Sequence, residues 1–410
     1  MQHVVVIGAG IVGVSSAIWL RRAGLDVTLV DRLGPGKGTS HGNAGVLAAV
    51  SMVPVTAPGL IAKAPGMLAS KDFPLFLRWA YLPKMVPWLL KYLSNANDAD
   101  TRRIARDLAP IVSDTVSQHL ALTAELDMQD WVTQSDYAFA YKSRKEFDAE
   151  SYTWSLRRDA GFEPTLIEGA DVQDYEPNIA QVGFVAAMND HGFIMDPGGY
   201  VAALADRFFA MGGQYRQTDV LDVDLSGGKV CGVETRDGRI DCDDLVLATG
   251  VWSKPLMKKL GLSVPLEAER GYHIVHTNAE GGPKRPTMIA AGKFVTTPMA
   301  AGVRCAGVVE FGGTEIGPSK APFDLLRKQT KQAFPRMTWD EEIEWMGHRP
   351  APSDSLPLIG EIGATRVFTA FGHHHIGLTG GPKTGRLVAG LVAGQPPNID
   401  LSAYAPQRFT

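Results

Sequence analysis

The hydrophobic pattern at the start of the chain predicts a strand, a helix and a second strand in immediate succession. Residues 2–7 carry a run of β-branched side chains, which is typical of a strand buried on both faces. Residues 14–23 have helical composition and are followed by Gly24, a residue type that commonly ends helices. Residues 27–31 form the second apolar run. We therefore expect a β-α-β unit with a glycine-rich turn at residues 8–13.

The rest of the chain mixes helical periodicity with alternating, strand-like segments. After the first unit we expect helices at 98–127, 145–160, 197–211 and 323–334, and short strands with a short helix within 165–195. We expect strands at 215–225, 230–235, 244–250, 264–277, 293–312 and 367–370. A last helix should reach about residue 392, with Pro382 in its first turn. The strands at 264–277 and 293–312 predict antiparallel sheet, unlike the two ends of the chain.

These elements predict an α/β fold (α+β overall), in which both ends of the chain build one Rossmann-like domain that binds a cofactor. A substrate or cap domain with antiparallel sheet and helices is inserted into it. The expected boundaries are 1–50, 150–260 and 350–410 for the cofactor domain, and 51–149 and 261–349 for the substrate domain.

The glycine-rich turn has the spacing of a dinucleotide-binding motif. Gly8 permits the tight turn, Gly10 lets the backbone approach a pyrophosphate, and Gly13 lets the helix pack closely on the strand. The helix N-terminus then offers N–H groups to the phosphates. Asp31, at the end of the second strand, is placed to accept hydrogen bonds from a ribose. Arg32 beside it leaves a phosphorylated ribose open.

Composition excludes several classes of protein. The net charge of the 410-residue chain is −4, so no basic field indicates nucleic-acid binding. Its three cysteines (Cys231, Cys242 and Cys305) are scattered, which suits a reducing compartment and argues against structural zinc. The N-terminus shows no secretion signal, and we expect a cytoplasmic protein.

Residues 73–93 are rich in aromatic side chains and leucine, but prolines and charged residues interrupt them too often for a transmembrane span. Two interpretations stay open. In one, helices here cover the substrate site. In the other, they form a surface that rests on the inner face of a membrane, with Trp79, Trp88, Lys84 and Lys91 at the interface.

Three further stretches have the character of cofactor loops. Residues 39–46 combine small residues and hydroxyls, which suit either a backbone that passes close to a cofactor or a surface loop. Residues 244–250 end an apolar strand on Thr249 and Gly250, where open α/β sheets place ligands. Residues 371–378 form a loop before the last helix.

Taken in order, these stretches resemble the FAD-dependent amine and D-amino-acid oxidoreductases, the group that holds D-amino-acid dehydrogenase, D-amino-acid oxidase, glycine oxidase and sarcosine oxidase. The resemblance rests on residues 8–13 with Asp31, 39–45, 248–250, 347–350 with 354–360, and 372–385. The closest likeness is to bacterial D-amino-acid dehydrogenases, including the branch that acts on D-proline and hydroxyproline-type imino acids.

The resemblance implies FAD, with Asp31 on the adenosine ribose, residues 39–46 along the ribityl chain and flavin ring, and the backbone near Val220 at the adenine. The last helix would direct its N-terminus at the flavin N1–C2=O edge, where reduction leaves negative charge. No cysteine follows Cys305, so the covalent link of the sarcosine-oxidase branch is excluded and non-covalent FAD is expected. The residues assigned to FAD are Gly8, Gly10, Ile11, Val12, Gly13, Asp31, Arg32, Thr39, Ser40, Asn43, Ala44, Gly45, Val46, Val220, Thr249, Gly250, Gly372, His375, Gly377, Leu378 and Thr379.

The resemblance also suggests the groups that act on the substrate. Arg349 lies at the family's carboxylate-binding position, and a guanidinium grips a carboxylate in a bidentate way. Tyr272 resembles a tyrosine that assists the carboxylate, although a core tyrosine fits the pattern as well. His41, His374 and His375 are candidates to line the flavin face and orient the amine, or to be loop imidazoles bonded to backbone. Because consecutive side chains point in different directions, His373–His375 do not predict a metal site.

The predicted reaction is hydride transfer from the substrate Cα to flavin N5. It gives an imino acid without a dedicated protein base, and electrons pass to a quinone or another acceptor. The alternatives are an oxygen-using oxidase of glycine, sarcosine or other N-methyl amines, a nicotinamide-dependent dehydrogenase, and a non-catalytic flavin-binding subunit.

Overall fold

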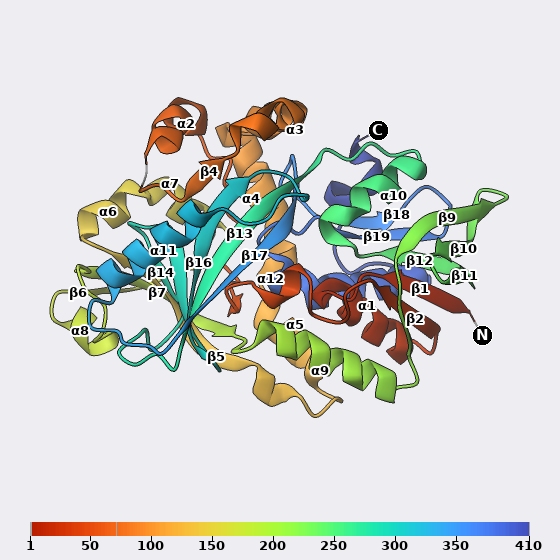
Figure 1. Cartoon of the computed structure of the whole chain (residues 1–410), viewed down its shortest axis with the longest axis horizontal. Helices are drawn as coiled ribbons and strands as arrows, with labels where there is room; N and C mark the ends of the chain where they lie inside the picture. The colour runs from red at the N-terminus through yellow and green to blue at the C-terminus, as the bar shows by residue number, and fades with distance from the viewer. Residues whose placement is uncertain (1, 71, 410) are drawn as a thin grey trace.

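The computed structural model describes residues 2–70 and 72–409. Two large sheets lie side by side, with helices over their outer faces (Figure 1). The first is a six-stranded sheet whose strands come from both ends of the chain and from residues 214–247. Its order is β18 (Leu358–Glu361), β19 (Val367–Phe371), β12 (Asp244–Leu247), β1 (His3–Ile7), β2 (Asp26–Asp31) and β8 (Gln214–Gln217).

All neighbours in this sheet are parallel except β18 and β19. Val4, Val5 and Val6 are fully buried because both faces of the sheet are covered. Helices α1 (Ile11–Arg22), α9 (Pro197–Ala210) and α12 (Gly377–Val392) belong to the core on one face. The core on the other face includes α10 (Ser253–Lys259) and the three-stranded sheet of β9 (Val220–Ser226), β10 (Lys229–Thr235) and β11 (Gly238–Asp241). The prediction of a Rossmann-like domain built from both chain ends is confirmed.

The last helix begins earlier than expected. Since α12 starts at Gly377, Pro382 lies within the helix and not in its first turn. Proline has no N–H, so the carbonyl of Leu378, four residues before it, loses its helical partner. That carbonyl instead lies 3.0 Å from Nε2 of the buried His119. A side chain from α5 (Thr115–Thr123) therefore completes the hydrogen bonding at the point where the helix would otherwise be weakest.

The second sheet contains ten strands and is mostly antiparallel, as the middle of the chain predicted. Its order is β17 (Glu342–Pro352), β13 (Leu266–Thr277), β16 (Gly302–Phe311), β15 (Phe294–Met299), β14 (Thr287–Ile289), β5 (Thr133–Tyr141), β7 (Phe184–Phe193) and β3 (Val46–Leu47), with β4 (Leu75–Leu77) beside β16 and β6 (Thr165–Glu168) beside β7. We expected residues 165–193 in the cofactor domain, but β6 and β7 pair within this sheet. We propose that the domain boundary lies beyond β7.

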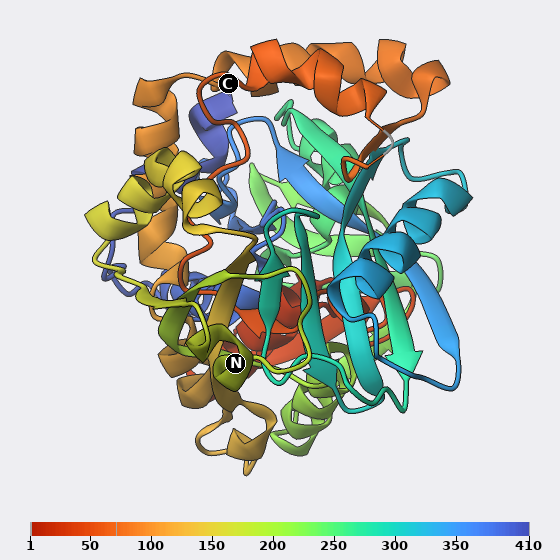
Figure 2. The same ribbon diagram turned by 90° about the vertical axis from the view of Figure 1, so that its left-hand side faces the viewer.

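Two of the predicted helices are each divided in the structure. The helix expected over 98–127 is α4 (Asp98–Val112) and α5, and the one expected over 145–160 is α6 (Arg144–Ala149) and α7 (Ser151–Asp159). Helix α11 (Lys320–Ala333) packs on β13 and β16, and α8 (Asp171–Tyr175) lies between β6 and β7 in the chain. Helices α2 (Leu60–Ala69) and α3 (Leu82–Ser94) run across the top of the molecule (Figure 2).

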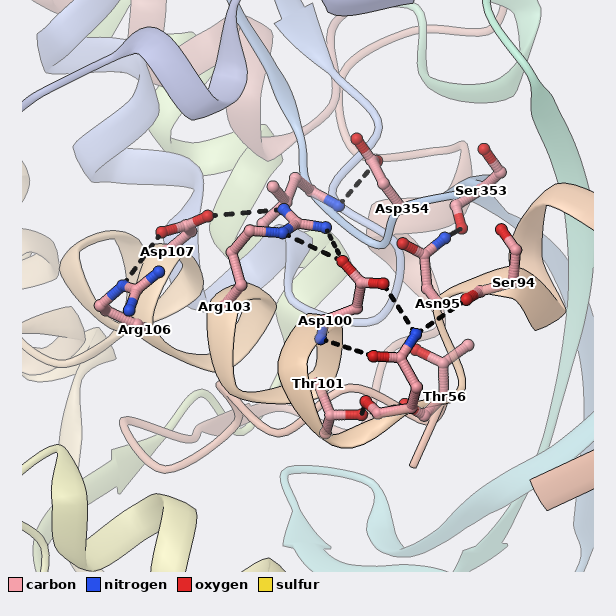
Figure 3. Close-up of polar contacts among 12 residues, drawn as sticks. Thr56, Ser94, Asn95, Asp100, Thr101, Arg103, Arg106, Asp107, Ser353 and Asp354 are labelled. Atoms are coloured by element: carbon pink, nitrogen blue, oxygen red, sulfur yellow. Dashed lines mark hydrogen bonds and ion pairs between the residues drawn. The ribbon is translucent and has the colours of Figure 1, made fainter. Parts of the chain in front are cut away.

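The start of α4 is tied to segments far away in the sequence (Figure 3). Asn97 caps the helix, since its side chain accepts a hydrogen bond of 3.0 Å from the Asp100 N–H. The Thr101 hydroxyl donates to the Thr56 carbonyl at 2.8 Å, and the Asn95 amide donates to the Ser353 carbonyl at 3.1 Å. The Asn95 bond attaches the end of α3 to the loop after β17, and the Thr101 bond attaches α4 to the segment between β3 and α2.

Candidate active site

A cavity of about 710 Å³ lies between the two sheets. It opens at the carboxyl ends of β1, β2, β12 and β19, because Gly8, Asp31, Thr249 and Phe371 all line it. Ligands of open α/β sheets bind at this edge. The large sheet closes the other side with residues of β5, β13, β14, β15, β16 and β17.

The glycine motif forms a tight cradle beside the cavity. Gly8 has φ +103°, and a Cβ there would lie 2.5 Å from the Ala248 carbonyl oxygen. A Cβ on Gly13 would lie 1.8 Å from the Gly8 oxygen, so only glycine lets α1 pack this closely on the β1 turn. Gly10, Ile11 and Val12 line the cavity, whereas Gly13 lies behind them. This space and the helix N-terminus fit a pyrophosphate.

Asp31 fastens the same turn. One carboxylate oxygen accepts from the Ala9 N–H at 2.8 Å, and the other accepts from Leu33 N–H at 2.7 Å and Gly34 N–H at 3.0 Å. The side chain also lines the cavity, so its contact with a ribose stays a prediction. The guanidinium of the adjacent Arg32 lies 4.3 Å from the centre of the Trp252 ring, which holds it at the cavity wall.

The other residues assigned to a flavin lie along the same cavity. The Ser40 hydroxyl accepts from the Ile11 N–H at 3.0 Å, and Thr39 donates to the His348 carbonyl at 2.8 Å, so residues 39–46 are fixed against both sheets and are not a loose surface loop. The further predicted residues that line the cavity are Asn43, Ala44, Gly45, Val46, Val220, Thr249, Gly250, Gly372, His375, Gly377, Leu378 and Thr379. Their individual flavin contacts stay predictions.

The N-terminus of α12 faces the cavity through Gly377, Leu378 and Thr379. None of the side chains that the structure describes caps this end, and its first turn has no acidic residue. The partial positive charge of the helix end is therefore available to an anion in the cavity. This is the place at which the sequence predicted stabilisation of negative charge on a reduced flavin.

Arg349 reaches the cavity, but it has a partner there that the sequence analysis did not find. Its Nη1 donates to Oε1 of Glu269 at 2.8 Å, and the other oxygen of Glu269 is bonded to Nε2 of His374. Glu269 and Arg349 face each other across β13 and β17. Burial would raise the pKa of Glu269, but His374 and Arg349 hold it well below its usual range. The carboxylate is therefore ionised and neutralises part of the Arg349 charge.

Two of the three histidines that line the cavity, His374 and His375, interact with this carboxylate. His375 Nδ1 lies 3.2 Å from His374 Nδ1, and its ring also bonds to the Ser51 backbone. Burial, with the nearby His374, lowers the pKa of His375 to about 3. His375 is thus neutral near pH 7. His373 points elsewhere, with Nε2 2.8 Å from the Thr384 hydroxyl. Among the described residues, no acid, cysteine and histidine cluster is arranged to hold a metal ion.

Two expected site residues lie away from the cavity. His41 is exposed and lies against Gly198 and Trp345, so it does not reach a flavin face. Tyr272 is on the opposite face of β13, where its hydroxyl donates to Glu310 at 2.5 Å and accepts from the Ser319 N–H at 3.0 Å. We correct both assignments. For Tyr272 the cause is strand alternation, since its neighbours Glu269 and Gly271 are the residues that face inward.

The comparison with protein families decides which cofactor this cavity serves. Residues 3–391 match the family described as DAO, FAD dependent oxidoreductase. The chain belongs to this family. Its cofactor is FAD, and the nicotinamide alternative is wrong. The glycine cradle, the free end of α12 and the long cavity all fit this group, and no cysteine lines the cavity among the described residues.

Known relatives extend over the full length of this flavoenzyme. A D-amino-acid oxidase of Bradyrhizobium diazoefficiens is 38% identical, covering 100% of this chain and 99% of the relative. D-amino acid dehydrogenase 2 of Pseudomonas aeruginosa is 30% identical, covering 99% and 98%. In fold, the chain is similar to glycine oxidase from Geobacillus kaustophilus, with a TM-score of 0.77, 20% identity and complete coverage of both chains (100% each).

Proposed function

We propose that this flavoenzyme oxidises the Cα–N bond of a D-amino acid or cyclic imino acid and that Arg349 anchors the substrate carboxylate. The observation that carries this proposal is a guanidinium at the same cavity as the FAD cradle. Within the described residues its one hydrogen bond is from Nη1 to Glu269, which leaves its other N–H groups for a ligand. The names of the relatives, a D-amino-acid oxidase and a D-amino acid dehydrogenase, support the D-amino-acid class.

The residues around Arg349 position and desolvate the substrate. Glu269 orients the guanidinium, and His374 in turn holds Glu269. Because burial lowers the pKa of His375 to about 3, this imidazole is a weak base, and we propose that the substrate reacts with its amine already neutral. FAD, when bound, supplies the two-electron acceptor for the hydride from Cα. Trp88 and Tyr92 of α3 are buried beside the Arg349 and Glu269 pair, and the Trp88 indole donates to the Ala351 carbonyl at 2.9 Å. Helix α3 thereby covers the substrate side.

An anaerobic substrate screen tests this proposal. The protein is mixed with D- and L-amino acids, prolines and N-methyl amines, and bleaching of the oxidised flavin absorbance is followed. We expect D-amino acids or cyclic imino acids to bleach it and their L-enantiomers to fail. Bleaching by N-methyl amines alone would favour the glycine and sarcosine alternative. A flavin that no amine reduces would indicate a non-catalytic subunit.

We also propose a membrane quinone as electron acceptor, because one face of the molecule suits a bilayer. The outer sides of α2, α3 and the preceding turn expose Trp79 (67%) and Leu90 (66%), whereas Trp88 is buried and cannot serve at an interface. Lys63, Lys84 and Lys91 are exposed on the same segment, and Asp72 is the only acidic residue within 51–97. No helix of the described residues is long and apolar enough to cross a membrane.

Vesicle sedimentation tests this face directly. Leu90→Glu should release the protein from anionic vesicles, whereas Leu225→Glu, on an exposed leucine of β9, should not. Equal binding by both variants would contradict the membrane face. The oxygen-using alternative is supported by the relative named as an oxidase. Stoichiometric hydrogen peroxide on turnover in air would establish it, and reduction of a soluble quinone analogue without peroxide would favour the dehydrogenase.

A further inference from the structure

A second arginine faces the cavity, and unlike Arg349 it forms no ion pair with any acidic residue that the structure describes. Arg157 of α7 is 9% exposed and lines the cavity. Its Nε and Nη1 are buried without a hydrogen-bond partner in the described part of the chain. Its guanidinium carbon lies 4.7 Å from the Phe139 ring centre and 4.5 Å from that of Trp154. The aromatic rings hold the cation in place but leave its N–H groups unsatisfied.

The nearest carboxylate does not neutralise Arg157. Glu150 acts on it electrostatically, but one oxygen of Glu150 is bonded to Lys293 and the other accepts from the Tyr141 hydroxyl at 2.9 Å. Tyr141 in turn accepts from the Trp154 indole at 3.0 Å. The adjacent acid is therefore engaged in its own network. A buried guanidinium without a counter-ion is costly to the free protein, which indicates that a ligand supplies the missing charge.

A second polar group lines the cavity and contacts the same Phe139 ring. Tyr137 of β5 is buried and lines the cavity, and its hydroxyl bonds to no described residue. The Tyr137 ring centre lies 4.7 Å from that of Phe139, the same ring that the Arg157 guanidinium contacts. Burial raises the pKa of this phenol, and the charge of Arg157 opposes the rise. Met288 and Val295, from the neighbouring strands, supply apolar walls. A guanidinium with a phenol between apolar walls suits a carboxylate.

We propose that Arg157 and Tyr137 bind a second acidic group of the substrate, so that the enzyme acts on amino acids whose side chain ends in a carboxylate. This inference rests on the proposed amino-acid oxidation, with Arg349 on the α-carboxylate. The two arginines come from different elements, α7 and β17, and line one cavity, and the inference requires a substrate whose two acidic groups span the distance between them.

The test compares substrates of equal shape and different charge. Anaerobic flavin reduction is measured with D-glutamate against D-glutamine and with D-aspartate against D-asparagine. We expect the wild type to prefer the acid of at least one pair, and Arg157→Met to lose roughly 30-fold or more of that preference, because losing one partner of a buried charge pair has effects of this size. Arg157→Lys should keep part of it. Arg158→Gln is the matched control, since Arg158 is exposed on the same helix and pairs with Glu163.

Three outcomes would overturn the inference. A wild type without preference for either acid has no acidic-side-chain site. Equal losses for acidic and neutral substrates in Arg157→Met would assign Arg157 to the α-carboxylate. A changed flavin spectrum and midpoint potential, with the preference intact, would assign it to the flavin.

A binding measurement separates this inference from the proposed function. Glutarate and butyrate, which cannot be oxidised, are titrated while the flavin absorbance is followed. Tighter binding of glutarate that disappears in Arg157→Met supports the acidic site even if no amino acid reduces the flavin. Equal binding of the two acids, with neutral D-amino acids still oxidised, would overturn the site and leave the proposed function in place.

Discussion

Replacing Gly271 with alanine should displace Arg349 without disturbing the strand. A Cβ at this position would lie 2.6 Å from both Cζ and Nη2 of Arg349, because the guanidinium lies directly over the glycine. Non-bonded carbon atoms prefer a separation of about 3.5 Å or more, so the guanidinium must move by roughly 1 Å. Gly271 does not have a positive φ, so alanine adopts its backbone conformation without strain.

The expected cost follows from the loss of position. A displacement of about 1 Å in a substrate-positioning group lowers turnover by roughly 100-fold, or about 2.7 kcal/mol in activation free energy. The same movement weakens the 2.8 Å contact between Arg349 and Glu269. The FAD cradle at residues 8–13 is on the other sheet, so the variant should bind flavin as the wild type does.

Stopped-flow flavin reduction under anaerobic conditions measures the effect, with flavin content and thermal unfolding recorded for each variant. Gly66→Ala is the control, because a Cβ there meets no atom within 4 Å. If Gly271→Ala bound and oxidised the substrate like the wild type, then Arg349 would not act from the position that it has in the structure. Weak flavin binding in this variant would instead indicate a wider disturbance of the fold.

Three other predictions address the anchor, the cofactor cradle and pH. Arg349→Met should weaken substrate binding by roughly 30-fold or more. It should also lower the free energy of unfolding by roughly 3–5 kcal/mol, because Glu269 stays buried with one partner fewer. Adding Glu269→Gln should restore stability in urea unfolding without restoring substrate affinity. Gly13→Ala should reduce the flavin bound per chain, since its Cβ would lie 1.8 Å from the Gly8 oxygen, and a full complement of FAD would refute this. Burial lowers the pKa of His119 to about 4, opposed by its Leu378 contact, against about 6.5 when unfolded. Between pH 6.5 and 4 the unfolded state therefore binds more protons than the folded state, so the free energy of unfolding should fall as the pH is lowered. This fall should be less steep in His119→Gln than in the wild type. Identical slopes of unfolding free energy against pH would contradict this prediction.

The parts of this molecule that could be predicted from the sequence are those whose signals are local. The cradle at residues 8–13 needs only a strand, three spaced glycines and a helix, all adjacent in the chain. Residues 39–46 and 377–379 were found for the same reason. Helix division was not predictable from periodicity, because α4 and α5 carry similar apolar patterns on both sides of Ser113. The start of the last helix was predicted too late because the hydrogen bond that Pro382 cannot donate is replaced by one from His119, which lies 263 positions earlier in the chain.

The substrate side depended on pairing across the large sheet, which leaves no local signal. Glu269 meets Arg349 only because β13 and β17 pair in one register, and the two are 80 residues apart in the chain. The sequence around Arg157 is typical of a helix. That no described acidic residue pairs with this guanidinium can be seen only from the three-dimensional positions of the neighbouring carboxylates. The one sequence signal for the ion pair with Arg349 was Glu269, an acidic residue in a segment otherwise typical of a buried strand, because a buried charge usually needs a charged partner.

Strand β13 joins the two sides of the substrate site, and this explains why Tyr272 matters without touching the cavity. Its inward residues Glu269 and Gly271 seat Arg349, while its outward residues Arg270 and Tyr272 bond to the buried Glu310 at 2.6 and 2.5 Å. Because every residue from Leu266 to His276 is buried, the strand cannot shift along its axis without exchanging these two faces. The outward network therefore fixes the register that places Glu269 opposite Arg349. Tyr272→Phe should then disturb the anchor less than a substitution of Glu310, which accepts both bonds.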